Sequence, residues 1–359
     1  MKRRLLIATL ACGLSLAPAV TRAQLSDKIT LNGYSSMEFE KLLDDDGVGD
    51  PHGSLDADLF DLVLNITPAP RFRVAADLTW EHGTATEEGF GNVAIEYAFA
   101  EYDVKDWLKF RAGKMFTHFG IYNEIHTAKP AFLTVKEPLS TNKNEKFGSD
   151  LRFYPRWGSG LAVLGNGHAS RVDFDYIVQL TNGAQAHTNP FEEDDNAQKA
   201  VAARLRVSPA RGLSVGASLY SDRITEMNGD GEDGGGRTGL LSYGAQAAWT
   251  PGALGLEAEY VRGHLAPSSS ARVRRWAATA MVYCRIRDRY TPYVRYEYLE
   301  PHAGIRDDQA RMFVYGVNVR VAQGLYLKAD LNTVRAGEAN QRFEGGKFTE
   351  FKAAIAAGF

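Results

Sequence analysis

Alternation between apolar and polar residues recurs along almost the whole chain and limits it to β structure. In the terminal segment Phe351–Phe359, every second residue is apolar and the last one is aromatic. Because a strand turns successive side chains to opposite faces, this segment predicts a strand with one wholly apolar face. Further segments with the same pattern are 72–80, 172–180, 201–207, 254–260, 313–321 and 325–331. No sustained helical spacing of apolar residues follows residue 23, so the chain is predicted to be all-β.

The connections between these segments alternate between short and long. Short turns are expected at 68–70, 104–106, 165–168, 209–210, 251–252, 287–289 and 322–324. Long polar loops are expected at 41–54, 83–91, 117–146, 182–196, 222–239, 265–271, 301–308 and 336–346. Short turns at one end and long loops at the other are typical of a transmembrane antiparallel β-barrel of the outer membrane, with the turns periplasmic and the loops extracellular.

The strand count depends on residues 147–165, which contain Pro155 and fit either a hairpin or one irregular strand. A hairpin would place the loop at 182–196 on the short-turn side and make the total odd. One strand places every long loop on one side and gives sixteen strands, with Pro155 at a bulge or outside the ladder. Sixteen strands are predicted, with eighteen as the alternative. Residues Phe351–Phe359 are then expected to pair antiparallel with Ile29–Phe39 and close the barrel.

The first 23 residues have the features of a secretory signal peptide. A basic start is followed by an apolar stretch and by small residues at Thr21 and Ala23, which predicts cleavage near Ala23. The barrel is then expected to span residues 24–359, in the bacterial outer membrane. Four of the 41 basic residues lie in the signal, so 37 bases face 44 acids in the remainder. This acidic balance argues against nucleic acid as a partner.

Other fold classes fit the sequence less well. A secreted β-sandwich also alternates, but a chain of this length would normally divide into several domains, and no linker is visible. No segment after the signal has the roughly 18 uninterrupted apolar residues of a transmembrane helix. A soluble secreted β protein remains the alternative to the barrel. On the barrel interpretation, outer-membrane lipid and lipopolysaccharide are the expected membrane partners.

The polar faces of the strands are predicted to line a water-filled lumen, because about sixteen strands enclose more space than side chains fill. The predicted lining is mixed in sign, and individual charges could simply pair across strands. Its predicted members are Arg71, Arg73, Asp77, Arg111, Arg152, Arg204, Arg206, Glu257, Arg285, Arg295, Glu297, Lys328 and Asp330.

The longest loop, 117–146, is hypothesised to fold into the barrel and narrow it; an external surface loop is the alternative. If it folds inward, its bases set the barrier to ions more than the wall charges do. The loop residues singled out are His118, Tyr122, Glu124, His126, Lys129, Lys136 and Lys143. Its two histidines are too isolated to predict a metal site.

Motifs for catalysis or cofactor binding are missing from the sequence, which contains no nucleophile elbow, zinc-protease motif, phosphate-binding loop or paired-cysteine motif. The chain is therefore predicted to be no enzyme and to need no cofactor. Acidic loops at 44–46, 192–195 and 228–233 are interpreted as solvated. Weak divalent-cation bridging to lipopolysaccharide phosphates stays open as an alternative.

Three stretches resemble the phosphate-selective porin O/P-like family. They are 108–116 with Phe119-Gly120, 175–183, and 203–216. This resemblance implies a sixteen-stranded diffusion channel that forms a homotrimer and folds its third external loop inward. Phosphate selectivity is not transferred, because it requires a basic pore and this chain is net acidic.

The sequence thus predicts an outer-membrane porin for passive diffusion of small hydrophilic solutes or ions, with anions as one option. A barrel with a closed lumen, acting as a surface adhesin or structural protein, is the alternative from another class. Conductance across a planar bilayer separates the two.

Overall fold

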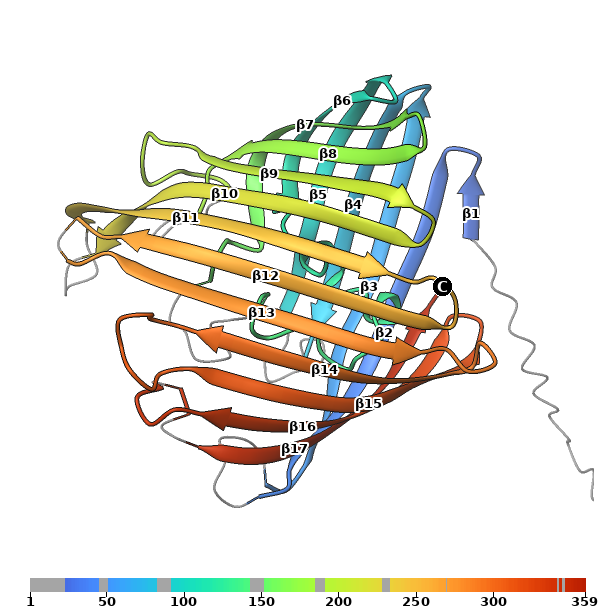
Figure 1. Ribbon diagram of the computed structural model, residues 1–359. Coiled ribbons are helices and arrows are strands. Elements are labelled where there is room, and N and C mark those ends of the chain that lie inside the picture. Colours follow the sequence, from blue (N-terminus) through green and yellow to red (C-terminus); the bar gives the residue numbers. More distant parts are fainter. Residues whose placement is uncertain are drawn as a thin grey trace, which may run out of the picture.

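Sixteen antiparallel strands form a closed barrel in the computed structural model (Figure 1). The structure describes residues 23–44, 51–82, 92–142, 152–184, 191–227, 233–268, 270–340, 342–343 and 346–359; the predicted signal peptide up to residue 22 lies outside them. The barrel strands are β2 (Ile29–Leu42), β3 (Ser54–Ala69), β4 (Phe72–Glu81), β5 (Asn92–Lys105), β6 (Leu108–Phe116), β7 (Trp157–Ala169), β8 (Val172–Thr181), β9 (Ala200–Ala210), β10 (Leu213–Met227), β11 (Asp233–Trp249), β12 (Leu254–Ala266), β13 (Val273–Cys284), β14 (Tyr290–Glu300), β15 (Ala310–Ala322), β16 (Leu325–Ala336) and β17 (Lys347–Gly358).

The last strand closes the ring against the first, as the sequence predicts. Strand β17 pairs antiparallel with β2, with Gly358 opposite Tyr34 and Phe351 opposite Lys41. Beyond this pairing, Phe359 exchanges two backbone hydrogen bonds with Gly33, at 2.9 and 3.0 Å. A short strand β1 (Ala23–Ser26) pairs with residues 29–31 of β2, which precede the residues of β2 that pair with β17. It takes no part in the ring of sixteen.

Alternation sorts the side chains between the two faces of the wall. On β13, Ala277 and Met281 are buried and point inward, whereas Val282 is 53% exposed on the outer surface. Exposed apolar side chains recur in the same phase on most strands, as in Phe110, Leu161, Val294, Leu327 and Ile355. This outer apolar surface is what a lipid-facing barrel wall requires. Among the described residues, no helix is long and apolar enough to cross a membrane.

Strand β7 resolves the segment at 147–165. The strand begins at Trp157, so Pro155 lies outside the ladder and the count of sixteen is confirmed. The turn expected at 165–168 is wrong, because β7 continues to Ala169 and the turn follows at 170–171. Gly165 and Gly167 serve close packing instead of a turn. A Cβ on Gly165 would lie 2.2 Å from the Trp107 carbonyl oxygen, and one on Gly167 would lie 2.5 Å from the Phe174 ring.

The β10–β11 hairpin is also longer than the sequence predicts. Residues that looked like a loop at 222–239 continue the ladder, with Arg223 opposite Gly239 and Thr225 opposite Arg237. Polar residues can continue a ladder where a hairpin extends past the apolar surface, because backbone pairing does not depend on side-chain polarity. The remaining tip, 228–232, lies outside the described residues.

Candidate functional site in the barrel lumen

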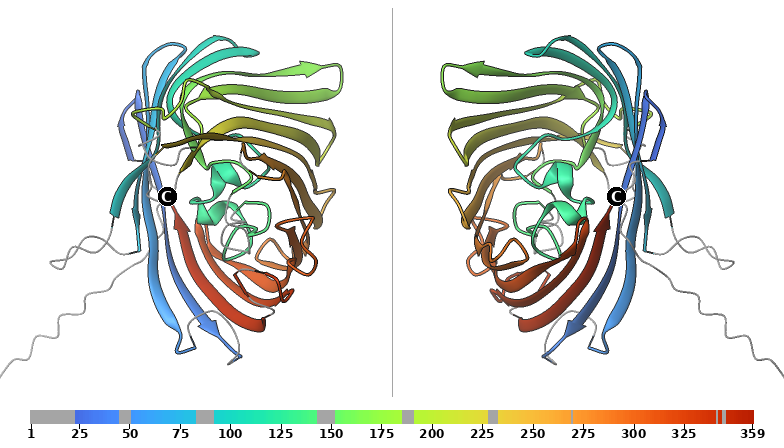
Figure 2. Two further views of the ribbon diagram at one scale, coloured as in Figure 1. Left: turned by 90° about the vertical axis from the view of Figure 1, so that its left-hand side faces the viewer. Right: turned by 90° about the vertical axis from the view of Figure 1, so that its right-hand side faces the viewer.

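Residues 117–142, which follow β6, lie inside the ring of strands (Figure 2). We call these residues the inner segment. It contains two short 3₁₀ helices, η1 (Asn123–Ile125) and η2 (Lys129–Ala131). The inward bend is fixed at its start, where the backbone N–H of His118 donates to Gln179 Oε1 of β8 at 2.8 Å and Gly120 takes a positive φ of 66°. Phe119 is fully buried and stacks on Tyr154 at 4.2 Å.

The first part of the inner segment is held by Arg204 of β9. Glu124 contacts His118 Nε2 at 2.9 Å and forms a close ion pair with Arg204. Burial alone would raise the pKa of the Glu124 carboxyl, but His118 and Arg204 outweigh it and hold this pKa below its usual range. Arg204 also donates to the carbonyl of Gly120 at 3.4 Å. One arginine of the wall therefore fixes both the bend and η1.

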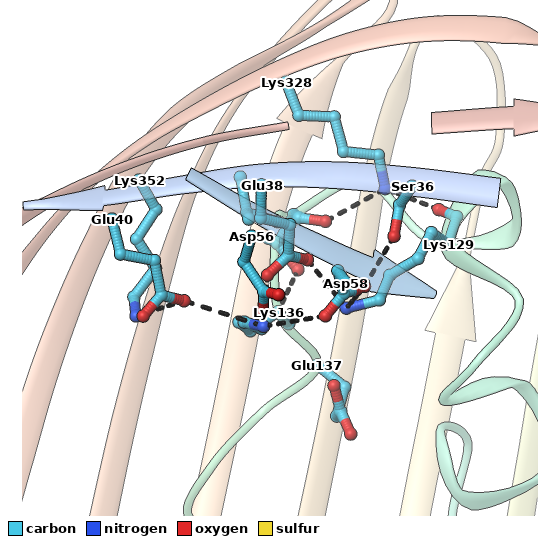
Figure 3. A network of polar contacts seen from close by, with 12 residues as sticks. Ser36, Glu38, Glu40, Asp56, Asp58, Lys129, Lys136, Glu137, Lys328 and Lys352 are labelled. Atoms are coloured by element: carbon cyan, nitrogen blue, oxygen red, sulfur yellow. Dashed lines mark hydrogen bonds and ion pairs between the residues drawn. The ribbon is translucent and has the colours of Figure 1, made fainter. Parts of the chain in front are cut away.

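At η2, two lysines of the inner segment meet carboxylates of β2 and β3 (Figure 3). Lys129 Nζ lies 2.8 Å from Glu38 Oε1 and 3.1 Å from Asp58 Oδ2. Lys136 contacts Glu38 closely, Asp58 at 3.2 Å and Glu40 at 3.6 Å. Burial acts to lower the pKa of both lysines, but these carboxylates outweigh it and raise both pKa values above the ordinary range. We call these two lysines with Glu38, Glu40 and Asp58 the lysine–carboxylate network.

Strand β16 holds the backbone of the inner segment. The Lys328 ammonium donates to the carbonyl oxygens of Lys129, Phe132 and Thr134, at 2.5, 2.6 and 3.0 Å. Asp330, two residues further along the same face, accepts from the Val135 backbone N–H at 2.9 Å. An ammonium has three donors, and here each of them meets a separate backbone acceptor. The inner segment is thus fixed by its main chain as well as by its side chains.

Strands β12 and β14 complete the attachment. Arg295 donates to Thr134 Oγ1 at 2.7 Å and to the Lys136 carbonyl at 3.0 Å, and it pairs with Glu297 at 2.8 Å. The Tyr122 hydroxyl donates to Glu257 at 2.5 Å. The Ser140 backbone N–H donates to Glu297 at 2.8 Å, and the Thr141 hydroxyl donates to Glu259 at 2.9 Å. Contacts therefore reach the inner segment from opposite sides of the barrel.

A hollow remains beside the inner segment, toward the short-turn end of β4–β9. Its volume is about 270 Å³. Five bases and three carboxylates line it: Arg73, Lys109, Arg111, Arg204, Arg206, Glu101, Glu124 and Asp175. Glu101 binds two of these bases, Arg111 at 2.7 Å and Arg73 at 2.9 Å. We call this space the arginine hollow, and its lining has an excess of positive charge.

Several residues expected in the lumen wall lie elsewhere. Arg71 is exposed in the turn between β3 and β4, with a positive φ of 65°, and donates to the Val104 carbonyl at 3.2 Å. Arg285 follows β13 in a turn at the same end. Arg152 precedes β7, and its carbonyl accepts from Arg275. Asp77 does face inward, is fully buried and accepts from the Tyr34 hydroxyl at 2.8 Å.

The two histidines of the inner segment lie apart, in separate environments. His118 belongs to the Glu124 cluster, whereas His126 Nε2 lies 3.4 Å from Glu96 Oε2, between the rings of Phe116 and Trp157. Within the described ranges, no three His, Cys, Asp or Glu side chains are grouped so that they could hold a metal ion. Lys143 lies outside the described residues.

Sequence reasoning missed the acidic partners of the loop lysines. Glu38 and Asp58 are almost fully buried and face inward, although neither was singled out. A signal was present, since Ser36, Glu38 and Glu40 occupy alternate positions of one strand. Glu101 was missed in the same way. Polar residues on one face of a barrel strand are expected anyway, so nothing in their pattern pointed to the loop.

No family model matches the chain. An uncharacterised protein of Aquifex aeolicus (strain VF5) is 22% identical over 230 residues; the match covers 60% of this chain and 49% of that protein, so it spans about half the length of that relative.

Solved structures match almost the whole chain at low identity. The anion-selective porin from Comamonas acidovorans has a TM-score of 0.67 at 10% identity, with 92% of this chain and 99% of that chain covered. OmpT of Vibrio cholerae gives 0.62 at 12%, covering 93% and 99%. The outer-membrane channel DcaP of Acinetobacter baumannii gives 0.60 at 11%, covering 92% and 97%. The chain therefore has the fold of the outer-membrane porins.

Proposed function

We propose that this protein is a passive porin of the bacterial outer membrane, with periplasmic turns and extracellular loops. Small hydrophilic solutes would cross it down their gradients. The observation that carries the proposal is the inner segment, which lies across the lumen and leaves the arginine hollow beside it. A segment held in this way narrows a barrel without requiring any reaction chemistry. Signal-peptide cleavage near Ala23 and the absence of enzymatic activity belong to the same proposal.

We further propose a preference for anions, set by the arginine hollow and not by the loop lysines. Lys129 and Lys136 are neutralised by Glu38, Glu40 and Asp58, so they present little net charge to a passing ion. In the arginine hollow the bases outnumber the acids. A wall with excess positive charge raises the local concentration of anions. The similar barrel from Comamonas acidovorans is described as anion-selective, which is consistent with this direction.

The resemblance of residues 108–116, 175–183 and 203–216 supports a relationship to the phosphate-selective porin O/P-like family. On the same ground we propose a homotrimer; one similar structure, of OmpT of Vibrio cholerae, is described as a trimer form. Phosphate selectivity is not part of the proposal. Chemical cross-linking of the membrane-inserted protein tests the trimer independently of its conductance.

The reversal potential in a salt gradient tests the anion preference. Arg111→Gln removes one base from the hollow, and Glu101→Gln removes the carboxylate that faces it, so the two variants should shift the potential in opposite directions. A unit charge about 5 Å from an ion in water contributes up to roughly 0.8 kcal/mol before screening, which is about a two- to fourfold change in the permeability ratio. Arg71→Gln, in the turn outside the hollow, is the matched control. Equal potentials in all three variants would remove the basis for the anion preference.

A closed barrel with a structural or adhesive role is the second candidate. It is favoured by the contacts of the inner segment with β2, β9, β12, β14 and β16, which reach opposite sides of the lumen. Planar bilayer recordings separate the two candidates. Discrete conductance steps support the porin, whereas a silent membrane containing folded barrels supports the closed lumen.

A further inference from the structure

A second hollow lies on the outer surface of the barrel, at the long-loop end of β9–β12. Its volume is about 680 Å³. Three small residues, Ser221, Gly239 and Ala266, form its middle. In the ladder, Gly239 lies opposite Arg223 on one side and Ala266 on the other, and Ser221 lies opposite Leu241. The small residues leave space that larger neighbours would fill. We call this space the outer hollow.

Cations surround the outer hollow. Three cationic side chains, Lys199, Arg223 and Arg272, are exposed and line it beside the His264 ring, and Lys199 is paired with Asp194. Arg274 lies directly opposite His264 in the β12–β13 ladder, and Arg262, Arg272 and Arg274 all lie near enough to His264 to act on it electrostatically. Among the described residues, the one carboxylate that lines it, Asp222, is 6% exposed and accepts from the Tyr220 hydroxyl at 2.8 Å.

Apolar side chains continue from the outer hollow along the wall. Val201 and Leu241 line it and are 36% and 40% exposed. Leu219 and Tyr243 continue the outer surface toward the middle of the barrel and are about equally exposed, at 41% and 39%. A cationic rim above an apolar surface matches a molecule with an anionic head and hydrocarbon chains. A free inorganic anion would use the rim and leave the apolar part of the surface without a partner.

We propose that the outer hollow binds the phosphate of a phosphorylated membrane lipid, whose acyl chains lie along Val201, Leu241 and the surface below them. This inference rests on the proposed membrane location of the barrel but not on its conductance. The arginines supply charge-assisted hydrogen bonds to phosphate oxygens, and the small residues at Ser221, Gly239 and Ala266 give the head group room to approach the strands.

Native mass spectrometry of the folded, detergent-released protein tests the proposal with three probes. These are diphosphoryl lipid A, the same lipid without its phosphates, and inorganic phosphate. We expect one diphosphoryl lipid A to be retained, and little of either other probe. Arg223→Gln and Arg272→Gln should each weaken retention about tenfold, as expected for the loss of a hydrogen bond to a charged group.

A shape variant makes the test independent of charge. Gly239→Leu fills the outer hollow, and its Cβ meets its nearest neighbour, Ala266 Cβ, at an ordinary 3.6 Å. It should reduce lipid retention while leaving the folded barrel intact, as judged by its heat-dependent migration on gels. Arg211→Gln, an exposed arginine in the turn between β9 and β10, is the control and should retain lipid like the wild type.

Several results would overturn the proposal. Unchanged retention in the arginine variants and in Gly239→Leu would place the lipid elsewhere. Equal retention of the phosphate-free lipid would remove the role of the cations, and retention of inorganic phosphate alone would mean a simple anion site. If Arg223→Gln and Arg272→Gln dissociate an oligomer and no lipid is retained, the surface contacts a second copy of the chain. Conductance should be unaffected in every variant, so failure of the porin proposal is recognised separately.

Discussion

Replacing Lys129 with methionine tests whether the lysine–carboxylate network holds the inner segment in the lumen. Methionine keeps much of the side-chain length and removes the charge. Lys129 lies 2.8 Å from Glu38 and 3.1 Å from Asp58, and all three side chains are nearly inaccessible to solvent. After the substitution, Lys136 alone faces Glu38 and Asp58, and it shares the more exposed Glu40 with Lys352. One cation then faces the two buried carboxylates that two cations faced before.

The magnitude follows from this geometry. At an effective dielectric constant of about 20, unit charges 2.8 Å apart attract by about 6 kcal/mol, which is an upper limit because both groups lose hydration. Removing one member of a buried ion pair typically costs about 3–5 kcal/mol. A loss of about 3 kcal/mol lowers the ratio of attached to detached inner segment roughly 100-fold. The other attachments, from β12, β14 and β16, remain.

Single-channel recordings in a planar bilayer measure the effect. Lys129→Met should give larger or noisier conductance steps than the wild type, because the inner segment detaches part of the time near β2 and β3. Adding Glu38→Gln should restore much of the wild-type behaviour, since the double variant removes a carboxylate with the lysine. Lys347→Met, which changes an exposed lysine at the long-loop end, is the control. Wild-type steps and noise from a folded Lys129→Met barrel would refute the role assigned to this network.

Three further predictions test other parts of the lumen and the closure. His126 is buried near Arg156, and its pKa is lowered to about 4, mainly by burial and secondly by this arginine. The folded form therefore stays neutral, while an unfolded segment binds a proton below about 6.5. Attachment should therefore weaken as pH falls from about 6.5 to about 4, by about 3 kcal/mol in all, and channel noise should rise in that window in the wild type but not in His126→Gln. Glu96 and Glu137 favour the proton, but burial and Arg156 outweigh them. Lys328→Met leaves three carbonyls of the inner segment without their donor and should weaken attachment by about 3 kcal/mol, seen as faster proteolysis of the inner segment in the folded barrel, with Lys328→Arg as the milder control. Gly33→Ala would place a Cβ 2.4 Å from the Phe359 ring and 2.5 Å from the Asp61 carbonyl, so it should lower the unfolding temperature by an amount equivalent to about 1–3 kcal/mol, whereas the same change at Gly252, with no neighbouring atom within 4 Å, should not.

The fold was predictable because each of its determinants is local in sequence. Apolar alternation marks a strand wherever one face meets an apolar medium, and loop length follows from which end of the barrel a connection crosses. These two signals fixed the number of strands and the pairing of β17 with β2. The errors occurred where a local signal had another cause. Gly165 and Gly167 looked like a turn, but Gly165 accommodates Trp107 in the turn between β5 and β6, and Gly167 accommodates Phe174 of β8.

The lumen was less predictable, because its contacts join residues far apart in the chain. The position of Lys328 on an inward face could be inferred from the alternation, but its three acceptors are carbonyls that the segment brings to it from almost 200 residues away. Arg295, Glu297 and Asp330 were likewise placed in the lumen without any indication that they bind the inner segment. Alternation assigns a side chain to a face; it carries no information about what lies opposite across the barrel.

The same limitation explains why the electrostatic role expected of the loop lysines changes. From the sequence, Lys129 and Lys136 are two positive charges on a loop that narrows the pore, and they would favour anions. In the folded barrel they meet Glu38, Glu40 and Asp58, and the network as a whole carries no excess positive charge. An ion responds to the sum of the charges within about a Debye length, so a neutralised base exerts little force on it. The excess of bases around Arg73, Arg111 and Arg206 is therefore the better candidate for selectivity, and removing the loop lysines should change the width of the pore before it changes the sign of the preferred ion.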